Sequence, residues 1–117
     1  MRIPTLTLAL ALCGLTGCAS DPAPTEQMRL SEQALEQAKA VGATDEVPEF
    51  KLAQDKLDRA RGNMLSAQYR DARMRAEQAE LDARLAEARV LTQKSQTQLN
   101  VVQTRVDRLR KQLAVQP

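Results

Sequence analysis

The spacing of large and small apolar residues after Phe50 constrains the fold of this chain most strongly. Apolar residues recur there at alternating steps of three and four, and every second one is alanine. The stripe consists of Phe50, Ala53, Leu57, Ala60, Met64 and Ala67. This spacing is typical of an α-helix that buries one side, and alternate alanines let a neighbouring helix approach closely, usually antiparallel. The pattern therefore predicts helices packed on helices.

A second apolar stripe follows, displaced by two residues from the register of the first. It consists of Tyr69, Ala72, Ala76, Ala79, Ala83, Ala86 and Val90. Two residues correspond to about 200° around a helix. One unbroken helix would have to change its buried side abruptly, whereas a turn near residues 66–68 would bring both stripes to one interface. We favour the turn, and the single long helix is the alternative.

A shorter helix is predicted over residues 25–41, ahead of the hairpin. Thr25 is a candidate N-cap and Gly42 a candidate C-terminal stop, while Pro48 suits the first turn of the next helix. Met28, Ser31, Leu35 and Ala38 form its apolar side. The predicted fold is all-α, with this short helix and an antiparallel hairpin of helices 48–65 and 68–113. The helical domain is expected to span residues 25–117, with a long, coiled-coil-like C-terminal helix.

The predicted third helix carries further apolar residues outside the alanine stripe. Met74, Leu81, Leu85 and Ala88 are expected to cover the first helix. Farther along lies a narrow seam of Leu99, Val102, Val106, Leu109 and Leu113. The first two helices are too short to reach this end, so the seam predicts self-association or docking of another protein of the same compartment.

The N-terminus resembles a bacterial lipoprotein signal. Arg2 precedes a mostly apolar run that is too short to span a bilayer permanently. The run closes with Leu15, Thr16, Gly17 and Cys18, which resemble a lipobox. The resemblance implies removal of residues 1–17, attachment of diacylglycerol and an N-acyl chain such as palmitate to Cys18, and a lipidated tether at 18–24. The alternative is a secreted protein with a Cys13–Cys18 disulfide.

The residue after the lipobox cysteine bears on the expected location. In lipoproteins of this type, aspartate at that position favours retention in the inner membrane, but this chain has Ala19. The resemblance therefore implies anchoring in the outer membrane of a Gram-negative bacterium, facing the periplasm. The partner of the seam would then be another envelope protein or a second copy.

Charge is unevenly distributed along the chain. Residues 18–50 contain two basic and seven acidic side chains, whereas residues 90–117 contain five basic and one acidic. The exposed basic tip would be Arg105, Arg108, Arg110 and Lys111. It suggests binding to peptidoglycan or anionic lipid as an alternative role. The overall net charge is only +2, so no nucleic-acid partner is expected.

No constellation of catalytic residues is present in the sequence. The chain has no histidine, and lipidation of Cys18 would leave the mature chain without a free thiol. Carboxylate pairs such as Asp55 with Asp58 and Glu77 with Glu80 alternate with basic residues, as on solvated helix faces. We therefore expect a protein that is not an enzyme, with no metal, no small-molecule substrate and no cofactor beyond the lipid on Cys18.

Several short stretches resemble one bacterial lipoprotein family. They are Pro48-Glu49-Phe50, Lys56-Leu57, Tyr69-Arg70-Asp71-Ala72 and the run Ala76-Glu77-Gln78-Ala79-Glu80-Leu81-Asp82-Ala83-Arg84-Leu85-Ala86. Together they are similar to the domain-of-unknown-function family DUF4398, over roughly residues 25–90. The resemblance implies a helical envelope lipoprotein and supplies no mechanism.

Overall fold

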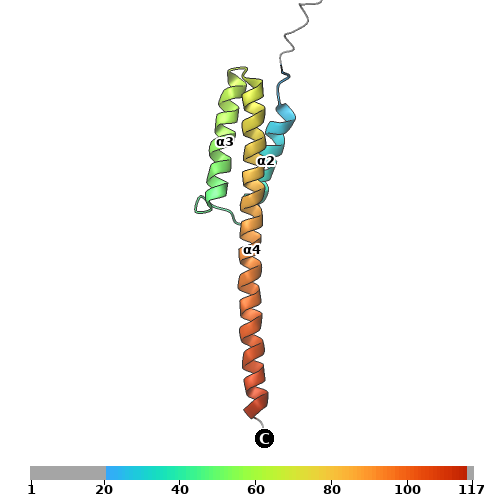
Figure 1. Cartoon of the computed structure of the whole chain (residues 1–117), viewed down its shortest axis with the longest axis vertical. Coiled ribbons are helices and arrows are strands. Elements are labelled where there is room, and N and C mark those ends of the chain that lie inside the picture. Colours follow the sequence, from blue (N-terminus) through green and yellow to red (C-terminus); the bar gives the residue numbers. More distant parts are fainter. Residues whose placement is uncertain (1–20, 116–117) are drawn as a thin grey trace, which may run out of the picture.

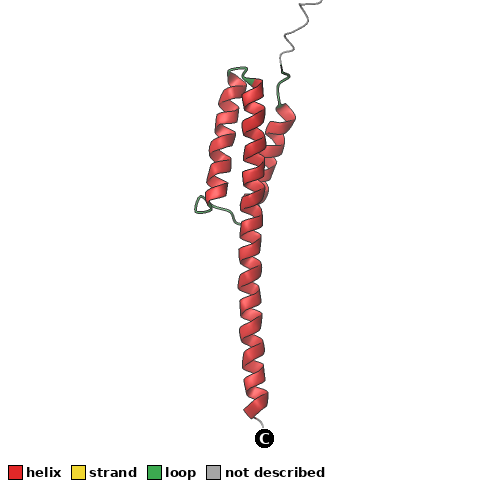
Figure 2. Ribbon diagram, viewed as in Figure 1, coloured by secondary structure: helices red, strands yellow, loops and turns green. Residues whose placement is uncertain are grey.

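The chain is all-α in the part that the structure describes, residues 21–115 of a computed structural model. It contains three helices, α2 (Thr25–Ala40), α3 (Pro48–Leu65) and α4 (Tyr69–Val115), and no strand within that range (Figure 2). The predicted fold class is confirmed. The predicted signal peptide and lipobox, including Cys18, and the predicted sorting residue Ala19 lie outside the described residues.

Helices α3 and α4 form the antiparallel hairpin, and α2 lies against the same half of α4 (Figure 1). The 47 residues of α4 span about 70 Å at 1.5 Å per residue. The other two helices contain only 16 and 18 residues. The C-terminal part of α4 therefore projects beyond the bundle, as the sequence predicts.

The two ends of α2 differ in how well the sequence predicts them. Gly42 follows the helix with φ of 100°, and the amides of Gly42 and Ala43 donate to the carbonyls of Lys39 and Ala38, both at 2.9 Å. This is a Schellman stop, as expected. Thr25 as N-cap is wrong: the cap is Pro24, whose carbonyl accepts from the Met28 amide at 3.0 Å.

The turn between α3 and α4 decides between the two interpretations of residues 48–113. The helix ends at Leu65, and Ala67 has φ of 54°. The amides of Ala67 and Gln68 donate to the carbonyls of Met64 at 3.1 Å and Asn63 at 2.9 Å, again a Schellman arrangement. The predicted turn is confirmed, and the alternative of one continuous helix is wrong.

Substitution of Ala67 by glycine is expected to stabilise the bundle. An L-residue with a Cβ is strained by about 1–2 kcal/mol in the left-handed region, which glycine adopts freely. Ala67→Gly should therefore raise the free energy of unfolding by roughly 1 kcal/mol, after allowance for the greater freedom of the unfolded chain. Urea denaturation followed by circular dichroism measures the change. A loss of stability would contradict this account of the turn.

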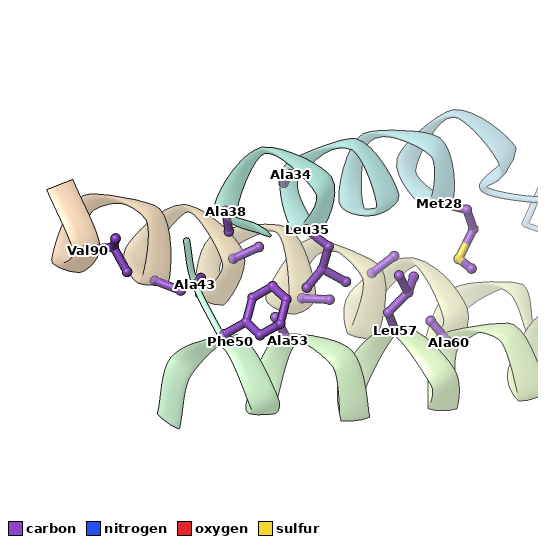
Figure 3. Close-up of a cluster of buried hydrophobic side chains, with 14 residues drawn as sticks. Met28, Ala34, Leu35, Ala38, Ala43, Phe50, Ala53, Leu57, Ala60 and Val90 are labelled. Carbon is purple, nitrogen blue, oxygen red and sulfur yellow. The ribbon is translucent and has the colours of Figure 1, made fainter. Parts of the chain in front are cut away.

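The core lies where the three helices meet, and alanine dominates it (Figure 3). Phe50, Leu35, Leu57 and Met28 are its large side chains, all at most 9% exposed. The α4 contribution is Ala72, Ala76, Ala79, Ala83, Ala86 and Val90, every one of them buried. Both predicted stripes are confirmed as buried surfaces except at the turn, where Met64 and Tyr69 are half-buried and Ala67 is exposed. The small side chains of α4 allow α2 and α3 to share one face of that helix.

The predicted cover for α2 is wrong. Met74, Leu81 and Leu85 are 50%, 67% and 55% exposed, and Ala88 is also exposed. The buried residues of α2 join the same cluster as the α4 alanines. Because these alanines occupy so little space, their stripe accommodates both shorter helices. The opposite side of α4 is therefore left open to solvent.

Candidate interaction surface

The uncovered part of α4 is the main candidate for a functional surface. Every residue from 91 to 115 is exposed. Near its start, Lys94 Nζ donates to the Val41 carbonyl at 2.5 Å and ties α4 to the end of α2. Beyond Lys94, no hydrogen bond or ion pair joins α4 to another helix within residues 21–115. The rest of the helix is held only by its own backbone.

The seam predicted from the sequence lies on this free segment. Its five residues are Leu99, Val102, Val106, Leu109 and Leu113, which are 58%, 54%, 38%, 53% and 72% exposed. Apolar side chains at heptad spacing on a lone helix gain little unless another helix covers them. The structure thus brings the predicted residues onto one free helix, while the partner stays a prediction.

The basic tip lies on the same segment. Arg105, Arg108, Arg110 and Lys111 are all exposed. Arg110 Nη1 is 4.0 Å from Asp107 Oδ1, at the limit of an ion pair, and both side chains are mostly exposed. Such a contact contributes little. The four cations therefore remain available to an anionic surface.

Polar contacts hold α2 and α3 against the first half of α4. Lys56 Nζ lies 2.6 Å from Asp82 Oδ2, and Gln27 Nε2 donates to Glu80 Oε2 at 2.8 Å. The hydrogen bond from Arg84, followed by that from Gln27, lowers the pKa of Glu80 below its ordinary value. These contacts join α2 and α3 to successive turns of α4, so that the three helices form one bundle.

A second ion pair joins the N-terminal end of α3 to α4, close to where the free tail begins. Arg89 Nη1 donates to Glu49 Oε1. This hydrogen bond is the main cause of the lowered pKa of Glu49. The side chain of Glu49 is 20% exposed and that of Arg89 is 56% exposed, so we assign the pair a positioning role and no large stabilisation.

An open groove between α2 and α3 is not predicted from the sequence. It has a volume of about 1270 Å³, with Leu35, Phe50 and Leu57 among its lining residues. Acidic side chains outnumber basic ones along it: Glu32, Glu36, Asp45, Glu46, Asp55 and Asp58 against Lys39 and Arg61. The acidic excess of residues 18–50 is the only feature of the sequence that points to this groove. The groove itself could not be predicted, because it forms only when two separate helices lie side by side.

The predicted carboxylate pairs take part in ordinary surface contacts. Asp58 Oδ1 lies 2.9 Å from Arg61 Nη1, and Glu80 Oε1 lies 2.7 Å from Arg84 Nη2. Within residues 21–115 no group of histidine, cysteine or acidic side chains is arranged to hold a metal ion. No helix in this range is long and apolar enough to cross a membrane.

The short segment ahead of α2 lies at the opposite end of the molecule from the free tail (Figure 1). Arg73 Nη2, in the first turns of α4, donates to the Pro22 carbonyl at 3.4 Å. Pro24 is buried. Any anchor N-terminal to Asp21 therefore joins the bundle beside the α3–α4 turn, and the tail points away from that end.

The arrangement of three helices and a projecting tail has a counterpart among known proteins. The family model for the domain of unknown function DUF4398 matches residues 26–102. The chain belongs to the DUF4398 family. This match covers the whole bundle and the first part of the free tail, and it confirms the resemblance seen in the sequence.

A solved structure is similar in both sequence and fold. It is the crystal structure of a DUF4398 family protein from Pseudomonas aeruginosa PAO1, which is 66% identical, with a TM-score of 0.78. The similarity covers 80% of this chain and 97% of the solved one. Among curated proteins, none matches this chain. DUF4398 is a family of unknown function, so a role must be argued from the surface.

Proposed function

We propose that this DUF4398 protein is an outer-membrane lipoprotein that acts as a structural or interaction module of the cell envelope and catalyses no reaction. The lipobox-like residues Leu15, Thr16, Gly17 and Cys18 support the anchor, and Ala19 supports outer-membrane sorting. The observation that carries the proposed role is the exposed apolar seam on the free part of α4. A scaffold needs such a surface to hold a partner.

The geometry of the bundle suits this role. The segment before α2 meets the bundle at one end, and the tail projects from the other (Figure 1). The tip at Arg108 lies roughly 60 Å along α4 from its start at Tyr69, at 1.5 Å per residue. An anchor at Cys18 would hold the first end at the membrane and leave the seam uncovered on the periplasmic side.

Crosslinking in living cells tests the proposal. A photoreactive residue at Val106 should capture one defined envelope protein or a second copy of the chain. Thr104 lies on the same exposed segment but about 200° around the helix, so it is the matched control. Capture from Val106 alone would support the docking role, whereas equal capture from both positions would contradict it. Cys18→Ser should release the protein from the outer-membrane fraction if the anchor is correct.

The basic tip supports a second candidate, binding to peptidoglycan or anionic lipid. All four cations are exposed, and their distance from the bundle end favours the cell wall over the bilayer that would hold the anchor. Reversal of Arg105, Arg108, Arg110 and Lys111 to glutamate separates the two roles. Loss of co-sedimentation with purified sacculi would support wall binding. Unchanged co-sedimentation and unchanged capture from Val106 would reject it.

A further inference from the structure

The outer side of α4 carries one heptad repeat, which is apolar except at Gln78, Thr92 and Ser95. Met74, Leu81 and Leu85 lie beside the bundle, and Leu99 lies two heptads beyond Leu85, while Val102 lies three heptads beyond Leu81. The open side of the bundle and the tail seam are therefore a single stripe. Its positions are Met74, Gln78, Leu81, Leu85, Ala88, Thr92, Ser95, Leu99, Val102, Val106, Leu109 and Leu113.

This outer stripe lies on the opposite side of α4 from the buried alanines. Leu81 and Ala83 are two residues apart, which is about 200° around a helix. Ala83 is fully buried and Leu81 is 67% exposed. A helix that docked along the outer stripe would therefore approach α4 from the side away from the core, with the Lys56–Asp82 ion pair at its edge. The stripe extends about 60 Å from Met74 to Leu113 at 1.5 Å per residue.

We propose that a second copy of this chain binds along the stripe, with the two α4 helices antiparallel. The proposal deepens the interaction role proposed above by naming the partner. In the register that we infer, Leu81 meets Leu113 of the second copy and Leu85 meets Leu109. Ala88 then lies opposite Val106, Thr92 opposite Val102 and Ser95 opposite Leu99. Two leucine layers therefore close each end of the interface, and between them a small side chain faces a large one in every layer.

The charges that flank the stripe select this orientation. In a parallel, in-register pair, the flanking positions would place Glu77 opposite Asp82, Arg84 opposite Arg89 and Arg105 opposite Arg110, which are all like charges. The antiparallel register brings Asp82 opposite Arg110 twice and places no like charges opposite one another among these flanking residues. Parallel pairing is therefore disfavoured, above all by the exposed Arg105 and Arg110. In the antiparallel pair each Arg110 would join the Lys56–Asp82 ion pair that already links α3 to α4.

The orientation has a consequence for the anchors. The bundle ends of the two copies would lie about 80 Å apart along the pair, at 1.5 Å per residue. Two lipid anchors could then enter one membrane only if the pair lay along its surface. An antiparallel pair would thus act as a flat strut, with the acidic grooves between α2 and α3 facing away from the paired α4 helices.

Disulfide trapping tests both the partner and the orientation. The full chain carries Cys13→Ser and Cys18→Ser, and is purified in two forms, one with Leu85→Cys and one with Leu109→Cys. Mild oxidation of the mixture should give a covalent dimer, and oxidation of either form alone should give none. Dimers from each form alone would show parallel pairing and overturn the proposal. No dimer in any sample would also overturn it.

A matched pair of valines tests the stripe itself. Val102 lies on the stripe, while Val101 is equally exposed, at 52% against 54%, but lies about 100° away. Val102→Asp should weaken dimerisation by at least about tenfold in sedimentation equilibrium, because it buries an unpaired charge. Val101→Asp should leave it unchanged. Equal effects, or a single-chain mass for the parent protein, would contradict the proposal. Because purified protein contains no other envelope component, such a result would reject the dimer only. The proposed interaction role would still be tested separately by crosslinking in cells.

Discussion

Phe50→Ala is expected to destabilise the bundle by about 3–5 kcal/mol, the usual cost of truncating a buried phenylalanine. Phe50 is the single phenylalanine of the chain and is 5% exposed. It fills the space between α2, α3 and α4 near Ala43 and Leu35 (Figure 3). Few other large side chains are present to relax into the cavity, because most of the neighbouring core residues are alanines.

Urea denaturation followed by circular dichroism measures this loss. Leu52→Ala is the matched control, since Leu52 lies on the same helix but is 49% exposed. Its effect should stay within about 1 kcal/mol. The free part of α4 contributes helical signal of its own, so the change is read from the midpoint of the cooperative transition. Equal shifts for both variants would show that Phe50 does not hold the three helices together.

Ala83→Leu is expected to destabilise the bundle by about 1–3 kcal/mol through overpacking. Ala83 is 0% exposed and belongs to the stripe on which both α2 and α3 rest. A leucine there would push at least one of the shorter helices away from α4. The substitution raises hydrophobicity and keeps helix propensity high, so a loss of stability would come from the lack of space alone.

The same substitution at Ala114 provides the control. Ala114 lies near the end of the free tail and is exposed, so Ala114→Leu should change stability by less than about 0.5 kcal/mol. Thermal unfolding of the two variants side by side gives the comparison. An unchanged or raised midpoint for Ala83→Leu would contradict the close approach of helices that the alanine stripe implies.

Local rules are enough to predict most of the helix boundaries from the amino-acid sequence. Gly42 and Pro48 bound the loop because one adopts positive φ and the other fits the first turn of a helix. The two-residue shift between the apolar stripes places the turn near residues 66–68, where Ala67 adopts the left-handed conformation. The N-cap at Thr25 is wrong because the helix begins one residue earlier than expected: the Met28 amide donates to the Pro24 carbonyl, which places Thr25 inside the first turn.

The sequence by itself determined that the chain is all-α, where most of its helices begin and end, and which seam the tail presents. These features depend on local spacing and backbone preference. Only the tertiary structure decided that α2 and α3 share the alanine face of α4, which leaves Leu81 and Leu85 exposed and opens the acidic groove. The reason is physical: a stripe of alanines specifies close approach, but it does not specify how many helices approach it.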